Sequence, residues 1–103
     1  MSDNELRKSI AEIAGFHTIQ QNPLYPNDKN KLAGFHAGDD SALYGIPDYL
    51  NSIDAVRAVV LKQDREEQRR FESLLFYSGG LFHEKSARDW AVALAKACSK
   101  FKE

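Results

Sequence analysis

Two histidines close the same four-residue string, Ala-Gly-Phe-His, which occurs once ending at His17 and again ending at His36. Imidazole nitrogens bind transition metals such as zinc and iron, and carboxylates often complete such a ligand set. Asp39 and Asp40 follow the second string closely, so they are the candidate third ligands. A metal site is therefore the first chemistry to test against the predicted structure.

The segments around the histidines have the pattern of a β-hairpin. Residues 16–20 alternate in polarity and are rich in aromatic and β-branched side chains, which is typical of a strand. Residues 21–31 contain two prolines and no apolar period, which predicts a loop. Residues 32–37 can then return as the partner strand.

The position of the turn decides which side chains face each other. A loop centred near Pro26 places His17 opposite His36, and it puts Phe16 and Phe35 together on the other face. Because side chains alternate along a strand, a slip of one residue would separate the histidines. An ordinary polar strand face is the simpler interpretation, so we predict no metal and no cofactor.

The repetition of the string does not indicate a duplication. Gly15 follows a helical pattern and predicts a helix end, whereas Gly34 follows a polar loop, so the two glycines meet different backbone needs. The flanking residues do not match, and a true repeat extends over a supersecondary unit of about 20 residues or more. We interpret the repeat as coincidental.

Apolar residues recur at helical spacing in four segments. In the first, Leu6, Ile10 and Ile13 share one face, with Asp3 as the predicted N-cap and Gly15 as the terminator. Residues 38–50 are predicted to be irregular. The stripes of the next two helices are predicted from the same spacing: Ile53, Val56 and Val60 behind a cap at Asn51 or Ser52, then Phe71, Leu74 and Leu75 behind Asp64.

The last helix has the clearest pattern. Ser86 and Asp89 resemble a capping box, in which each of the two side chains accepts a hydrogen bond from the backbone N–H of the other residue. One face then carries Ala87, Trp90, Ala91, Leu94, Cys98 and Phe101. Residues 1–103 are therefore predicted to form one α+β domain, a small antiparallel hairpin or sheet packed with about four helices in the order α-β-β-α-α-α.

Four strings along the chain together resemble the phage ABA sandwich domain family of small phage and prophage proteins. They are "IAEIAGF", "IPDYLNSIDAVRAV", "EEQRRFESLL" and "SARDWAVALAKA", and in order they cover nearly the whole chain. The chain departs from the family pattern in the Phe-His of the hairpin and in Glu84-Lys85-Ser86 before the last helix. The resemblance implies an α/β/α sandwich-like fold from a mobile genetic element, and the family brings no established activity.

Composition argues against several classes of protein. With 14 basic and 15 acidic side chains the formal charge is −1, so no global field attracts nucleic acid or an anionic membrane. There is one cysteine, and no apolar run approaches the ~20 residues of a membrane span. We expect a cytoplasmic protein, in the host cell if a phage encodes it.

Catalytic patterns are missing from the sequence. Cys98 lies on the apolar stripe of the last helix, where a thiol has little thiolate character. There is no Gly-x-Ser-x-Gly elbow and no phosphate-binding glycine loop. We therefore predict that the protein is not an enzyme.

Aromatic residues outside the periodic segments favour a binding role. Tyr25, Tyr44, Tyr49 and Phe82 lie in segments that are predicted to be irregular. Such side chains often anchor interfaces, although each one taken singly is more simply explained as covering the core. The leading hypothesis is a non-enzymatic accessory protein that binds a host or phage protein, with a homodimer through uncovered strand edges as a further prediction.

A different class of function uses the polar side chains of the hairpin. His17, His36, Lys29 and Lys31 could together hold a small ligand, either a nucleotide or a metal ion. This alternative requires the four side chains to lie near one another.

Overall fold

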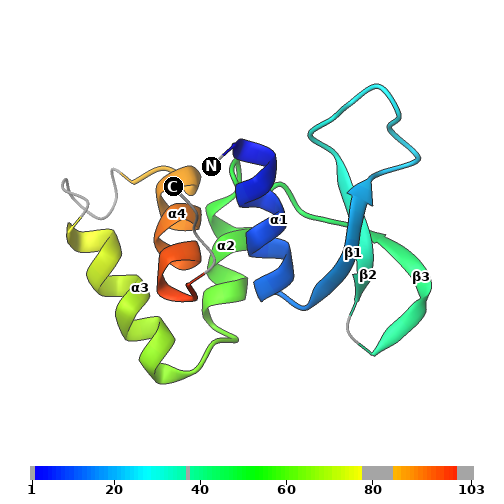
Figure 1. Ribbon diagram of the computed structural model, residues 1–103. Coiled ribbons are helices and arrows are strands. Elements are labelled where there is room, and N and C mark those ends of the chain that lie inside the picture. Colours follow the sequence, from blue (N-terminus) through cyan, green and yellow to red (C-terminus); the bar gives the residue numbers. More distant parts are fainter. Residues whose placement is uncertain (1, 37, 78–84, 100–103) are drawn as a thin grey trace.

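The computed structural model describes residues 2–36, 38–77 and 85–99. Over these ranges the elements are α1 (Asp3–Ile13), β1 (Phe16–Gln21), β2 (Leu32–His36), β3 (Asp39–Gly45), α2 (Ile53–Val60), α3 (Arg65–Tyr77) and α4 (Ala87–Ala97). The strands form one antiparallel sheet in the order β1-β2-β3 (Figure 1). The predicted α+β class is confirmed.

The helices form a group to one side of the sheet, with α3 farthest from it (Figure 1). Within this group α4 packs against α1, α2 and α3. Its buried face consists largely of small side chains, which let neighbouring helices approach closely. The sheet contacts the helical group mainly through α1 and β1.

Helix α1 begins one residue earlier than predicted. The N-cap is Ser2, whose Oγ accepts a hydrogen bond from the Glu5 backbone N–H at 3.2 Å, so the assignment of Asp3 as the cap is wrong. Asp3 instead occupies the first turn, where its carboxylate accepts from Arg88 Nε at 3.2 Å. Gly15 follows the C-cap with φ 102°, as expected for a glycine that ends a helix.

Helix α2 confirms Ser52 as its N-cap but corrects its buried stripe. Val56, Val59 and Val60 are buried, whereas Ile53 is exposed, so the placement of Ile53 in the core is wrong. Ile53 is the first helical residue of α2, and its side chain is 37% exposed.

The predicted caps of α3 and α4 are confirmed. The Asp64 carboxylate accepts from the Glu67 backbone N–H at 2.8 Å, and Ser86 with Asp89 forms the full capping box. Phe71 and Leu75 of α3 are buried, and so are Ala87, Trp90, Ala91 and Leu94 of α4. Phe101, which was assigned to the same stripe, lies outside the described residues.

The sheet has a third strand that the sequence did not predict. Residues 39–45 were expected to be irregular, but they pair with β2, with Ala33 opposite Gly45 and Gly34 opposite Tyr44. Ile46 extends the pairing by donating its backbone N–H to Leu32 O at 2.9 Å. The segment has no clear alternation of polar and apolar residues, so it was predicted as irregular, although only two residues separate it from its partner strand β2 and His36 pairs with Asp39.

Candidate functional site

The two histidines do not face each other. Phe16 pairs with His36, and His17 pairs with Phe35, so the imidazoles point to opposite faces of the sheet. The ring contacts agree: Phe16 meets His36 edge-on at 5.2 Å, and His17 stacks with Phe35 at 6.0 Å between centroids. The predicted pairing of the histidines is wrong, and so is the shared face of Phe16 and Phe35.

A β-bulge in β1 changes the register. Two residues, Thr18 and Ile19, lie between the pairs His17–Phe35 and Gln20–Ala33, and they oppose one residue of β2, Gly34. Thr18 has φ 53°, a conformation that a β-branched residue rarely adopts.

Gly34 fits the bulge because it has no side chain. A Cβ on Gly34 would lie 3.1 Å from the His17 carbonyl oxygen and 3.3 Å from Ile19 Cγ1. The two glycines of the repeated string therefore serve different needs, one a positive φ and the other a close backbone approach, as the sequence predicted.

Metal binding finds no support at the hairpin. Among the described residues, no group of three or more His, Cys, Asp or Glu side chains is placed to hold a metal ion. The side chains of Asp39 and Asp40, the predicted third ligands, are not described.

His17 has a hydroxyl neighbour in the bulge. Its Nδ1 lies 3.1 Å from Thr18 Oγ1, and both side chains are exposed beside Lys8 and Glu12 of α1. A histidine next to a hydroxyl is the pair that activates nucleophiles, but such chemistry depends on a setting from which water is excluded. The exposed position of this pair does not provide that setting.

The loop between β1 and β2, residues 22–31, is built by its own hydrogen bonds. The Asn22 side chain is buried, and its Oδ1 accepts from the Leu24 backbone N–H at 3.0 Å. Gln21 Nε2 donates to the carbonyls of Tyr25 and Pro26 at 3.2 and 2.7 Å. The Asp28 carboxylate accepts from the Asn30 N–H at 3.0 Å, which closes the returning arm.

Two large apolar side chains project from this ordered loop. Leu24 is 81% exposed and Tyr25 is 50% exposed. Lys31 places its Nζ 5.7 Å from the centre of the Tyr25 ring, a cation–π contact that favours one ring position. The loop therefore presents an apolar side chain and an aromatic ring in a defined arrangement.

Polar contacts from α1 hold the loop and the chain before α2. Asn4 Nδ2 donates to the Lys29 carbonyl at 2.9 Å, and Arg7 reaches Asn30 Oδ1 at 3.5 Å. The buried guanidinium of Arg7 also pairs with Asp48 at 3.1 Å. Burial acts to raise the pKa of Asp48, but hydrogen bonds from Asn51 and Arg7 outweigh it, so the pKa is lowered.

The predicted aromatic contact residues differ in how exposed they are. Tyr25 and Tyr44 are exposed, Tyr44 in strand β3. Tyr49 belongs to the segment that leads to α2 and is buried in the core, so its assignment as a contact residue is wrong. Phe82 lies outside the described residues. The sequence analysis missed Leu24, although its place between Pro23 and Pro26 was a signal for a rigid, exposed leucine.

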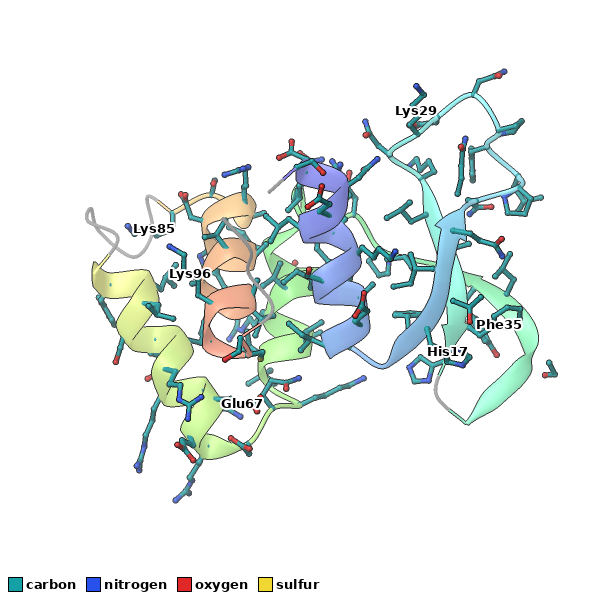
Figure 2. All side chains as sticks on the ribbon, in the orientation of Figure 1. His17, Lys29, Phe35, Glu67, Lys85 and Lys96 are labelled. Atoms are coloured by element: carbon teal, nitrogen blue, oxygen red, sulfur yellow. The ribbon has the colours of Figure 1, made fainter. Side chains whose placement is uncertain are left out.

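The four polar residues of the alternative ligand site do not gather. His17 and His36 lie at the end of the hairpin near the carboxyl end of α1, whereas Lys29 and Lys31 lie in the loop at the opposite end. Figure 2 shows this separation for His17 and Lys29. A single site built from these four side chains is therefore ruled out.

Cys98 has the properties expected of an unreactive thiol. It is partly buried next to Glu67, whose Oε2 accepts from the Cys98 Sγ at 3.4 Å. Burial, together with this carboxylate, raises the pKa of Cys98 to about 11. The thiolate form is therefore scarce at neutral pH.

Comparisons with protein-family models, with curated proteins and with solved structures find no match to this chain. Among the described residues, no helix has the length and apolar character needed to span a bilayer.

Proposed function

We propose that this chain is a protein-binding module and that its contact surface is the loop of residues 22–31. One observation carries the proposal: Leu24 and Tyr25 are exposed on a loop that hydrogen bonds already hold in shape. A preformed loop loses little conformational entropy on binding, and large apolar or aromatic side chains are frequent interface anchors.

The charges of the loop indicate what surface it fits. Lys29 and Lys31 are exposed next to the apolar pair. We infer a partner protein with an apolar pocket for Leu24 and Tyr25 and acidic side chains around it. The family resemblance suggests that the partner is a host or phage protein in the cytoplasm. No catalytic step is part of the proposal.

Quantitative affinity capture from host cells tests the proposal. The Leu24→Ser, Tyr25→Ala double variant should reduce recovery of a specific partner at least tenfold, because each anchor contributes about 2 kcal/mol at an interface. Leu61→Ser is the matched control, since Leu61 is also a largely exposed leucine, at 67%, and it lies in the helical group. Equal recovery by both variants, or loss with Leu61→Ser alone, would contradict the proposal.

The homodimer remains a separate proposal. Strand β3 is an edge of the described sheet, and edge strands can pair with a second copy. Light scattering over a hundredfold range of concentration would show the mass double if the strands pair. A constant mass of 11.6 kDa would exclude the dimer.

A further inference from the structure

A pocket of about 230 Å³ lies where the sheet meets the helical group. It opens at the carboxyl end of α1, between the paired residues Phe16 and His36 and the amphipathic helix α2. Pro47, Tyr49 and Val59 complete most of its apolar wall. The pocket is distinct from the loop of residues 22–31, so what it does is independent of the proposed protein-binding function.

The pocket lining includes a side chain that carries a hydroxyl group, that of Tyr49. Tyr49 is only 2% exposed, and its side chain is part of the pocket lining. Burial raises the pKa of Tyr49 to about 12, so the hydroxyl keeps its proton at neutral pH. Among the described residues, the Tyr49 hydroxyl is not one of the side-chain polar atoms that are fully buried without a hydrogen-bond partner. The protonated hydroxyl can donate a hydrogen bond to an oxygen atom of a ligand in the pocket.

The rim of the pocket indicates the charge of the ligand. His36 and Lys62 are exposed there, and the lining residues include no aspartate or glutamate. An ammonium group next to low-dielectric walls attracts an anion more strongly than it would in open water. The floor is apolar and the rim is cationic, which is the arrangement that a ring with one acidic group would complement.

We propose that this pocket binds a small aromatic carboxylate, a single ring that carries one carboxylate group. A cavity of about 150 Å³ is enough to hold benzene, so the larger pocket has room for the ring and its substituent. The ring packs against Phe16 and Val59. The carboxylate accepts hydrogen bonds from the Tyr49 hydroxyl and the Lys62 ammonium.

Titration of the ¹⁵N-labelled protein with sodium benzoate, followed by NMR, tests the site. We expect saturable shifts at residues around the pocket and a Kd of about 1 mM, in keeping with the size of the ligand. Benzyl alcohol keeps the ring without the charge, and sodium acetate keeps the charge without the ring. Each should bind at least fivefold more weakly than benzoate.

Three variants separate the parts of the site. Tyr49→Phe removes only the hydroxyl and Lys62→Gln only the charge, and each should weaken benzoate binding about fivefold to tenfold. Ala58→Leu fills the pocket from its exposed rim and should abolish saturation without a change in fold. Lys29→Gln is the control, because Lys29 lies in the distant loop (Figure 2) and should leave the Kd unchanged.

Several outcomes would overturn the proposal. These are the absence of saturable shifts up to 50-fold above the expected Kd of about 1 mM, equal binding of benzyl alcohol and benzoate, or shifts that Ala58→Leu leaves unchanged. Weaker binding by Lys29→Gln and Lys62→Gln alike would also overturn it, because it would indicate general attraction between charges and not a built site.

Discussion

The helical group and the sheet differ in how they are stabilised. Buried apolar side chains gather in α1, α2, α3, α4 and the segment before α2, whereas the sheet contributes only Ala33 to the buried hydrophobic residues described. The sheet is held by backbone pairing and by contacts of its β1 side with α1. Stability is therefore concentrated in one region, and the other is left to expose side chains that can bind.

Polar contacts join the two regions. Arg7 belongs to α1, but it contacts Asn30 in the β1–β2 loop and Asp48 in the chain that leads from β3 to α2. Because Arg7 is buried, its guanidinium has little contact with water, and these oxygen atoms stabilise its charge instead. Hydrogen bonds from Asn4 and Arg7 thus hold the exposed loop against α1, and the ion pair of Arg7 with Asp48 holds the segment before α2.

The largest effect should come from the core of the helical group. Leu94→Ala removes a fully buried side chain of α4 and should lower the free energy of unfolding by about 3 kcal/mol, measured by urea denaturation. Ile19→Ala, which truncates a partly buried side chain of the sheet, should cost about 1 kcal/mol. Equal costs would mean that the core extends evenly through both regions.

A smaller loss is expected from Gly34→Ala, at about 1–2 kcal/mol in the same assay. The added Cβ would meet the His17 carbonyl at 3.1 Å, and a backbone atom cannot move without disturbing the bulge. Gly45→Ala is the control, because a Cβ there meets only Asn22 Nδ2 at 3.7 Å. If both variants lose the same stability, the tight approach at Gly34 is not what selects glycine.

Asp48→Asn tests the contact between the two regions and should cost about 1 kcal/mol at pH 7, a modest amount because the side chain is 34% exposed. The pKa of Asp48 is lowered in the folded protein. Its contribution is therefore complete above the unfolded pKa of about 3.9 and is lost as the pH falls through the lower folded value. The difference between wild type and variant should shrink below pH 4. A difference that is constant down to pH 2 would contradict this.

The smallest effect should have the opposite sign. Thr18→Gly relieves a β-branched residue at φ 53° and should raise stability by about 0.5 kcal/mol, since glycine's greater unfolded entropy offsets part of the gain. Thr18→Ala keeps a side chain at the same φ and should show no gain. A loss of stability with glycine would show that Thr18 Oγ1 and His17 Nδ1 contribute more than the strained backbone costs.

Local patterns predicted the helical group well and the sheet poorly. The caps at Ser52, Asp64 and Ser86 and the stripe of α4 depend on residues within a few positions of one another, so the sequence displays them directly. The strand partner of His17 is set by a bulge in β1. The burial of Tyr49 is set by how the segment before α2 packs on the core. Neither has a local signal.

The loop of residues 22–31 was predicted as a loop, and Tyr25 as a candidate contact residue within it, because prolines and the missing apolar period exclude a helix or strand. Its internal hydrogen bonds, and the prominence of Leu24, appeared only in three dimensions.

The sequence by itself determined the four helices, the capping residues of α3 and α4, and the glycine that ends α1, because the interactions responsible span three or four residues. Tertiary structure decided the third strand, the register that separates the two histidines, and the pocket at Tyr49. Each of these depends on contacts between separate elements, and in the sheet a shift of one residue turns a side chain to the other face.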